Sequence, residues 1–283
     1  MTKYGSIIFP CFEQGVKCLY DVAIARAAPV SIRLVDNQQF QFGQALKPGA
    51  DHWTEAVKSK AQKWYVTKRL KFDPERMVAA TLMFEGDAAE VAAQEKKLYA
   101  IAARHGGLKS GEENGIRGYF LTYMIAYLRD FGFNYKFIAE SFETSVPFSA
   151  VLPLCASVKA RIHAVAAEAG VKFKPFVSCR VTQLYDTGAC VYFYFGFIWE
   201  GLADPVGAYS KIEHEAREEI LRHGGSISHH HGIGKLRSDF LPGTVGPEGM
   251  RMLKAVKDAV DPTNVFAVGN LGLDKVPKIA AKL

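Results

Sequence analysis

Three consecutive histidines, His229 to His231, stand near the C-terminal end of the chain, between Ser228 and a Gly-X-Gly turn at 232–234. Each imidazole carries a donor and an acceptor, so three together need many hydrogen-bond partners if they are buried. The glycines of the turn let a ligand approach the backbone closely. Because histidine titrates near neutral pH, the cluster suits acid–base chemistry, anion contacts or metal binding. The sequence therefore predicts the reactive site here.

The spacing of the histidines limits what they can do together. An extended chain would place His229 and His231 on one face and His230 on the other. A metal site needs a third ligand in a fixed geometry, and no HExxH pattern or paired carboxylate stands nearby. We therefore predict no metal and favour contacts to an anion or a cofactor, with a purely structural role as the second possibility.

The aromatic run at 192–195 belongs to an expected strand. Alternation places Phe193 and Phe195 on the core face and Tyr192 and Tyr194 together on the other, where their hydroxyls need partners. A tyrosine hydroxyl, with an ordinary pKa of about 10, becomes a usable base only where cations or donors stabilise its phenolate. Histidine or arginine beside this face would supply that stabilisation.

Arg33, Arg129 and Arg180 each stand among apolar residues. A buried arginine requires a carboxylate or a bound anion, and its planar fork matches phosphate oxygens bidentately. The sequence leaves open whether Arg129 binds a phosphate ester or pairs with Asp130 or another acid. The acidic segment at 143–145 is interpreted as a strand end and helix cap without a catalytic role.

Composition excludes several classes of function. The 283 residues are 49% hydrophobic, enough for one large core or two modest ones. The formal charge of +6 is scattered, which argues against a nucleic-acid platform and suits an anionic substrate or an acidic membrane surface. Five cysteines without a CxxC pair indicate reduced thiols in an intracellular compartment. No apolar run reaches the roughly 18 residues of a membrane span.

Apolar periodicity predicts an α+β fold with a largely antiparallel sheet, helices on one face and two β-α-β-like halves. A mostly helical sequence follows Asp204, so we predict a sheet domain over 1–204 and a helical region over 205–283. Neither GxGxxG nor GxxxxGK[ST] occurs, which excludes a familiar nucleotide-binding loop. The expected strands cover 4–9, 29–35, 77–84, 134–142, 174–183 and 189–199, and the expected helices 12–27, 87–105, 118–131 and 147–170.

Several segments together resemble the alkylglycerone-phosphate synthase (alkyl-dihydroxyacetone-phosphate synthase) family of vanillyl-alcohol-oxidase-type FAD flavoproteins. The resemblance implies that 1–204 is the substrate (cap) domain and that 205–283 would pack on an FAD-binding domain. That domain comes first in the family, and nothing in this chain resembles it, so we expect the chain to be the C-terminal portion of such an enzyme. The similar segments are 31–43, 118–130, 140–147, 179–183, 190–195, 228–237 and 261–266.

The resemblance implies an activity in ether-lipid biosynthesis. The family exchanges the acyl group of 1-acyl-dihydroxyacetone phosphate for a long-chain fatty alcohol, giving alkyl-dihydroxyacetone phosphate and a fatty acid. FAD takes part through a flavin N5 adduct without net redox change. By resemblance, Tyr192 is the acid–base group at the substrate's C1 carbon, and Arg129 binds the substrate phosphate.

The resemblance also assigns the remaining site residues. His229, His230 and His231 are implied to be catalytic, beside the flavin and the substrate head group. His230, His231 and Gly232 are implied to contact FAD, and Arg33 is implied to organise the site. No metal is implied.

The C-terminal tripeptide Ala281-Lys282-Leu283 is similar to the Ser-Lys-Leu peroxisomal address. With the family resemblance it implies recognition by the peroxisomal import receptor and a peroxisomal location, or a glycosomal one in a trypanosomatid. The family further implies a homodimer in the full-length enzyme and peripheral contact with a membrane.

Three alternatives stand beside this prediction. An FAD-dependent 2-hydroxyacid dehydrogenase would share the cap and the His-Gly-Ile-Gly turn, and would use Arg129 for a carboxylate. In the second alternative, the isolated chain is a catalytically silent substrate-binding or assembly module. The third alternative is a zinc hydrolase built on the three histidines.

Overall fold

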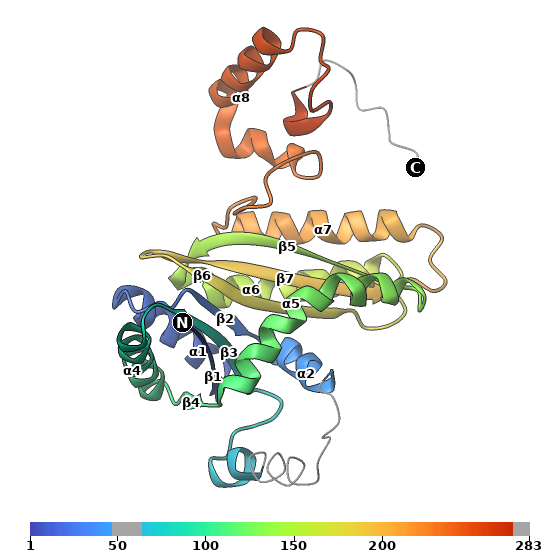
Figure 1. The fold of residues 1–283 in the computed structure, drawn as a ribbon. Coiled ribbons are helices and arrows are strands. Elements are labelled where there is room, and N and C mark those ends of the chain that lie inside the picture. Colours follow the sequence, from blue (N-terminus) through green and yellow to red (C-terminus); the bar gives the residue numbers. More distant parts are fainter. Residues whose placement is uncertain (47–63, 274–283) are drawn as a thin grey trace.

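The computed structural model describes residues 1–46 and 64–273. Its centre is a seven-stranded sheet in the order β4-β1-β3-β2-β6-β7-β5, with antiparallel pairing between neighbours (Figure 1). The strands are β1 (Thr2–Phe9), β2 (Ser31–Val35), β3 (Val78–Glu85), β4 (Leu108–Lys109), β5 (Phe137–Pro147), β6 (Phe176–Leu184) and β7 (Gly188–Ile198). The longer helices are α1 (Phe12–Ile24), α2 (Asn37–Ala45), α4 (Ala88–Arg104), α5 (Glu112–Phe133), α6 (Phe148–Glu168), α7 (Pro205–Arg222) and α8 (Leu241–Val260). The predicted α+β class with an antiparallel sheet is confirmed.

Two halves of the sheet repeat one arrangement. Each consists of a strand, a helix and two further strands, and the last strand lies between the other two: β1-α1-β2-β3 in the first half and β5-α6-β6-β7 in the second. The halves join where β2 pairs with β6, with Leu34 opposite Val181 and Val35 opposite Arg180. We call this junction the seam.

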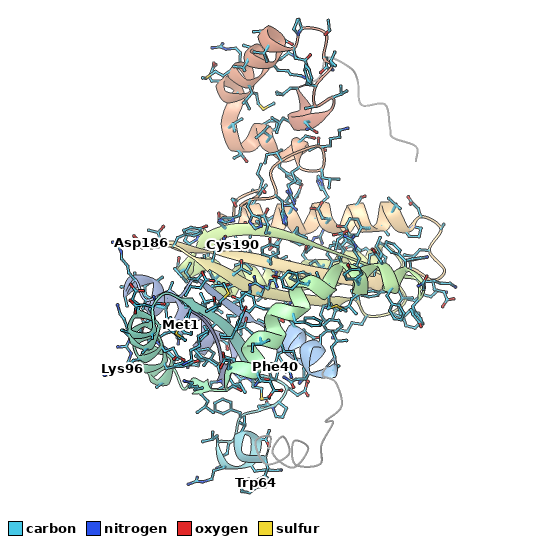
Figure 2. All side chains as sticks on the ribbon, in the orientation of Figure 1. Met1, Phe40, Trp64, Lys96, Asp186 and Cys190 are labelled. Atoms are coloured by element: carbon cyan, nitrogen blue, oxygen red, sulfur yellow. The ribbon has the colours of Figure 1, made fainter. Side chains whose placement is uncertain are left out.

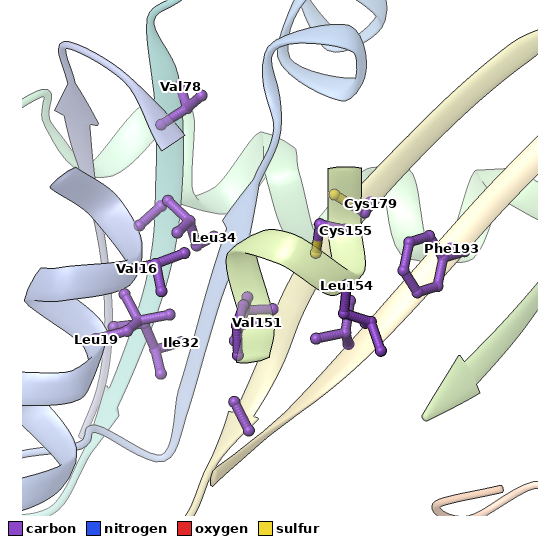
Figure 3. Close-up of a cluster of buried hydrophobic side chains, with 14 of the residues drawn as sticks. Val16, Leu19, Ile32, Leu34, Val78, Val151, Leu154, Cys155, Cys179 and Phe193 are labelled. Atoms are coloured by element: carbon purple, nitrogen blue, oxygen red, sulfur yellow. The ribbon is translucent and has the colours of Figure 1, made fainter. Parts of the chain in front are cut away.

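One face of the sheet forms the core. Because side chains alternate along a strand, every second residue of β2, β3, β6 and β7 points to this face and is buried there. Helices α1 and α6 cover it, as the close-up in Figure 3 shows. Each fully buried Leu or Phe contributes about 1.5–3 kcal/mol to stability through the hydrophobic effect. Buried residues that meet across this layer include Val16, Leu19, Ile32, Leu34, Leu154, Cys155, Cys179 and Phe193.

The opposite face, here called the site face, carries Arg33, Thr81, Arg180 and Tyr192 at neighbouring register positions. Helix α5 crosses it (Figure 1), so the expectation of helices on one face only was incomplete. The cause is a close approach at Gly118, where a Cβ atom would stand 2.4 Å from the Thr81 side chain. Local periodicity predicted a helix there but could not reveal which face it covers.

The start of α4 follows a local capping signal, whereas the end of β5 does not follow the local pattern. Asp87 and Glu90 form a capping box at the start of α4, near the predicted start at residue 87. Strand β5 was predicted to end at residue 142, but it continues to Pro147. The first three extra residues, at 143–145, are polar, and their partners come from a segment more than 80 residues away in sequence. Tertiary contacts therefore set the length of this strand.

The predicted helical region begins with a helix that packs on the sheet domain. Ile212, Ala216 and Ile220 of α7 are fully buried in the same core as α6. By contrast, α8 and the residues that follow stand apart from the sheet in Figure 1. This part exposes apolar side chains, among them Met252, Val256, Val260, Val265 and Phe266.

Helix α6 has the length and apolar composition of a membrane span. It packs along the core face of the sheet, and Val151, Leu154, Val158, Ile162 and Val165 are fully buried there. In this structure it is therefore a central core helix.

Candidate active site

The segment at 226–231 passes around the free edge of β5. Ser226 donates its backbone N–H to the Ser145 carbonyl at 2.9 Å, and the Ser145 N–H donates to Ser226 Oγ at 2.9 Å. Thr144 Oγ1 donates to the Ser226 carbonyl at 2.7 Å. Helix α7, which precedes this segment, packs with α6 on the core face. These contacts therefore hold the chain where it passes around the edge of β5, and they place the histidines on the site face.

Glu143 of β5 holds the histidine segment in place. Its side chain is fully buried and accepts hydrogen bonds from Ser228 Oγ at 2.8 Å and from the N–H groups of His229, His230 and His231. Burial alone would raise the pKa of this carboxyl, but these donors outweigh it and hold the pKa at about 2. Glu143 is therefore an ionised anchor at neutral pH.

Two arginines support the histidine segment from either side. Arg217 of α7 is fully buried, pairs with Glu213, and donates to the Ile227 carbonyl at 2.7 Å. Arg237 donates to the carbonyl of Gly232, the first residue after the histidines. Burial is the main reason that the pKa of Arg237 is lowered. Both ends of the segment are thus fixed by buried cations.

The three histidines form one connected cluster with two tyrosines. The Tyr192 hydroxyl contacts Nε2 of His230 and lies 3.3 Å from Nε2 of His231. His229 Nε2 lies 2.6 Å from the Tyr185 hydroxyl, and the Nδ1 atoms of His229 and His230 are 2.8 Å apart. The segment is bent where its N–H groups donate to Glu143, so the alternation of an extended chain does not apply, and His230 and His231 meet the same tyrosine.

The strand positions of the aromatic residues are as predicted. Phe193 and Phe195 are buried in the core, whereas Tyr192 and Tyr194 stack on the site face with ring centroids 6.0 Å apart. Burial raises the pKa of Tyr192 to about 12, and the nearby Tyr194 adds to this, although Arg180 opposes it. Burial also lowers the pKa of His231. At neutral pH, Tyr192 is therefore a phenol with a proton to donate, and His231 beside it is a neutral imidazole.

The structure brings two of the three singled-out arginines to the site face. The Arg180 guanidinium lies 5.1 Å from the Tyr192 ring centre and 4.9 Å from that of Tyr194. Arg33 lies 4.4 Å from the ring centre of Tyr119 on α5. Cation–π contacts of this kind hold a guanidinium in place, and Nε of Arg180 is buried without a hydrogen-bond partner among the described residues.

Arg129 has a different environment. Its Nη1 lies 3.0 Å from Glu140 and its Nε 3.5 Å from Asp130, and 42% of its side chain is exposed. The pairing with acids that the sequence left open is thus observed. Among residues 1–46 and 64–273, Arg129 makes no hydrogen bond or ion pair with the histidine cluster.

A possible metal-ligand set was not foreseen. The donor atoms of Cys190, His229 and His230 lie within 4.8 Å of one another. Figure 2 marks Cys190 at the end of the sheet nearest the C-terminal helices. Burial raises the pKa of the Cys190 thiol to about 11, which disfavours the thiolate that zinc prefers. The three groups have the right types for zinc, but the cysteine is in its weaker ligand form.

Sequence reasoning missed Glu143 as a site residue. It was interpreted as a strand end because its partners, 85 to 88 residues away, leave no trace in the local pattern. The only signal was the polar Glu-Thr-Ser run at 143–145 within a strand that alternates up to residue 142. A buried acid in such a run requires several donors, and the histidine segment provides them.

Comparisons with known proteins show the family to which the chain is related. The family model for the C-terminal domain of FAD linked oxidases matches residues 1–271. The chain is 48% identical over 271 residues to alkyldihydroxyacetonephosphate synthase of Caenorhabditis elegans, covering 96% of this chain and 45% of that protein. It is 27% identical to the enzyme of the same name from Trypanosoma brucei brucei, over 96% of this chain and 44% of that protein. The chain thus spans a little under half the length of these relatives, and the family resemblance is confirmed.

Solved structures show the same fold. An alkyldihydroxyacetonephosphate synthase matches with a TM-score of 0.71 and 20% identity, covering 93% of this chain and 44% of that one. Substrate-bound p-cresol methylhydroxylase matches with a TM-score of 0.63 and 15% identity, covering 97% and 53%.

Proposed function

Because the chain belongs to the family of FAD-linked oxidase C-terminal domains, we propose that it is the substrate-facing part of an alkyl-dihydroxyacetone-phosphate synthase. In the net reaction, the C1–O bond of 1-acyl-dihydroxyacetone phosphate breaks, and a fatty acid leaves. A long-chain alcohol forms the new C1–O ether bond and gives up its hydroxyl proton. The observation that carries the proposal is the Tyr192–His230–His231 cluster held on the site face by Glu143.

The cluster fits a proton transfer at the substrate's C1 carbon. The Tyr192 phenol has a proton to donate, and the Nε2 atoms of His230 and His231 adjoin its oxygen. Proton transfer by a positioned side chain accelerates reactions by about 10²–10⁴-fold. FAD, when bound, would supply the electron-pair donor and acceptor that these side chains lack. His229 completes the cluster by orienting His230 through the Nδ1 contact.

The residues around the histidine turn fit a planar cofactor. A Cβ atom placed on Gly232 or Gly234 would meet nothing within 4 Å, so the backbone is open to a ligand there. We propose that His230, His231 and Gly232 contact the flavin. We further propose that the region 205–283 completes the binding of an FAD domain, with the exposed apolar side chains of α8 as the contact surface.

We propose that Arg129 binds the substrate phosphate. Its pairs with Glu140 and Asp130 are half exposed, and such surface pairs contribute only about 0–1 kcal/mol. A phosphate dianion accepting two hydrogen bonds from the guanidinium fork can therefore replace them. Arg33, held against Tyr119, would organise the neighbouring part of the site face.

The location and assembly of the protein are proposed on the same basis. Ala281-Lys282-Leu283 lies outside the described residues, and we propose that it directs the protein to peroxisomes, or to glycosomes in a trypanosomatid. A homodimer and peripheral membrane contact would suit an enzyme acting on two lipid substrates.

The direct test is an exchange assay in the FAD-containing full-length protein, measuring incorporation of a labelled long-chain alcohol. We expect Tyr192→Phe to lower the rate by about 10²-fold or more, because the hydroxyl carries the transferred proton. The matched control is Tyr99→Phe, which changes a half-buried tyrosine of α4 in the other half of the sheet and should leave the rate unchanged. Full exchange by Tyr192→Phe would remove this tyrosine from the mechanism.

A further inference from the structure

Two hollows open on the site face, on either side of Arg33 and Arg180. The smaller, of about 130 Å³, lies between the sheet, α2 and α5, and Ile8, Phe40 and Ile125 are among its apolar lining residues. The larger, of about 390 Å³, is lined by Tyr185, Tyr192 and His230 among others. Arg33 and Arg180 line both hollows, so they stand between the hollow that contains Tyr192 and His230 and the apolar recess.

The charged side chains that the structure describes around the two hollows are all arginines. Arg33, Arg180 and Arg117 line the smaller hollow, and among the residues that the structure describes no aspartate or glutamate lines either hollow. Arg180 Nε and Arg117 Nη1 are buried without a hydrogen-bond acceptor among the described residues. A buried guanidinium donor without an acceptor is unfavourable, so its neighbourhood suits a bound anion.

The guanidiniums are positioned before any ligand arrives. Arg180 lies against the rings of Tyr192 and Tyr194, and Arg33 against the ring of Tyr119. The charge of Arg33 and burial both lower the pKa of Arg180, with burial the larger cause. An anion beside Arg180 would offset its repulsion by Arg33 and accept a hydrogen bond from the unpartnered Nε of Arg180.

We propose that Arg180, together with Arg33 and Arg117, forms a binding subsite for the carboxylate of a long-chain fatty acid, whose chain enters the smaller hollow. The apolar lining beside the cations is the reason to choose a fatty carboxylate over inorganic or ester phosphate. This inference rests on the proposed function, in which a fatty acid is the leaving group. In this proposal the fatty acid leaving group binds next to Tyr192, and it dissociates from this subsite before the alcohol enters.

The test measures binding, without catalysis, by titration calorimetry of the full chain with laurate kept below its micelle-forming concentration. We expect the wild type to bind laurate, and Arg180→Gln to bind it at least about tenfold more weakly, because a charged bidentate contact is lost. Dodecanol, which has the same chain without the charge, should bind no more tightly to the wild type than to Arg180→Gln. Arg104→Gln is the matched control: this arginine of α4 is 64% exposed, pairs with Asp21 and lines neither hollow, so the variant should bind laurate as the wild type does.

If Arg180→Gln does not fold, as judged by near-UV circular dichroism, Arg117→Gln takes its place, and it should weaken laurate binding about threefold or more. Unchanged laurate affinity in a folded variant would overturn the proposal. So would inorganic phosphate that displaces laurate at equal concentration, because the subsite would then select phosphate.

Failure of this proposal and failure of the proposed function are distinguishable. Laurate binding that depends on Arg180, in a protein without acyl-for-alcohol exchange, would refute only the proposed function. Exchange activity together with laurate binding that is indifferent to Arg180 would refute only the carboxylate subsite.

Discussion

The two halves of the sheet share one arrangement but differ in what they offer to a ligand. On the site face, the middle strand of the first half, β3, presents Ala79, Thr81 and Met83. The middle strand of the second half, β7, presents Cys190, Tyr192 and Tyr194. The scaffold is thus the same in both halves, and the candidate chemistry combines a few outward side chains of β7 with the histidine segment.

The halves also differ in what covers this face. In the first half α5 lies directly on β1 and β3, with Gly115 and Gly118 at the points of closest approach. In the second half the histidine segment passes around the edge of β5 and stands over β7. Arg33 and Arg180 come from equivalent strands, β2 and β6, and meet at the seam. The first half therefore contributes the cover of α5 and one cation at the seam, and the second contributes the candidate reactive groups.

Of the changes considered, Glu143→Ala should have the largest effect on stability, and it acts on the second half of the sheet. It would leave the N–H groups of the histidine segment without an acceptor, at an expected cost of about 4 kcal/mol in the free energy of unfolding. The matched control is Glu95→Ala in the first half, where the carboxylate pairs with Lys3 and Lys109, whose side chains are 35% and 57% exposed and can return to water. We expect that change to cost about 1 kcal/mol. Urea unfolding of both variants gives the comparison, and equal costs would contradict it.

Acid should weaken the second half through the same carboxyl. Glu143 has a pKa of about 2 in the folded protein, below the ordinary value of 4.5. A lowered pKa means that its stabilisation is complete above about pH 4.5 and is lost as the pH falls toward 2, by on the order of 3 kcal/mol. Glu143→Gln should flatten this part of the stability profile. A mutant profile as steep as that of the wild type would assign the acid sensitivity to other groups.

Arg129→Ala should have the smallest effect on stability, because its carboxylate partners are exposed. We expect the free energy of unfolding to change by less than about 1 kcal/mol. The same variant should raise the KM for acyl-dihydroxyacetone phosphate in the exchange assay if Arg129 binds the phosphate. A large loss of stability would instead identify Arg129 as a structural residue that joins α5 to β5.

The sequence predicted the scaffold well where the pattern is local. The alternation in β2 and β7 and the capping box of α4 gave these elements nearly their observed bounds. The triple histidine and Tyr192 were correctly expected to need partners, and they are partners of each other. Local pattern also separated Phe193 and Phe195 from the tyrosines between them.

What the sequence could not reveal depends on contacts between distant segments. The role of Glu143 requires the histidine segment, and the bend of that segment requires Glu143. The covering of the site face by α5 depends on the fit of Gly118 against Thr81. The sequence indicated that Arg180 is unusual. Its neighbour Arg33, however, comes from the other half of the fold, 147 positions earlier in the chain. Each is a tertiary property with no local signature.

The central claim is that Glu143 fixes the histidines over β7. Amide hydrogen exchange at His229 and His231, in the wild type and in Glu143→Gln, tests it most directly. We expect slow exchange in the wild type and a marked acceleration in the variant, because the ionised acceptor is lost, while the amides of β1 and β3 are unaffected. Equal exchange of the two histidine amides in both proteins would contradict the claim.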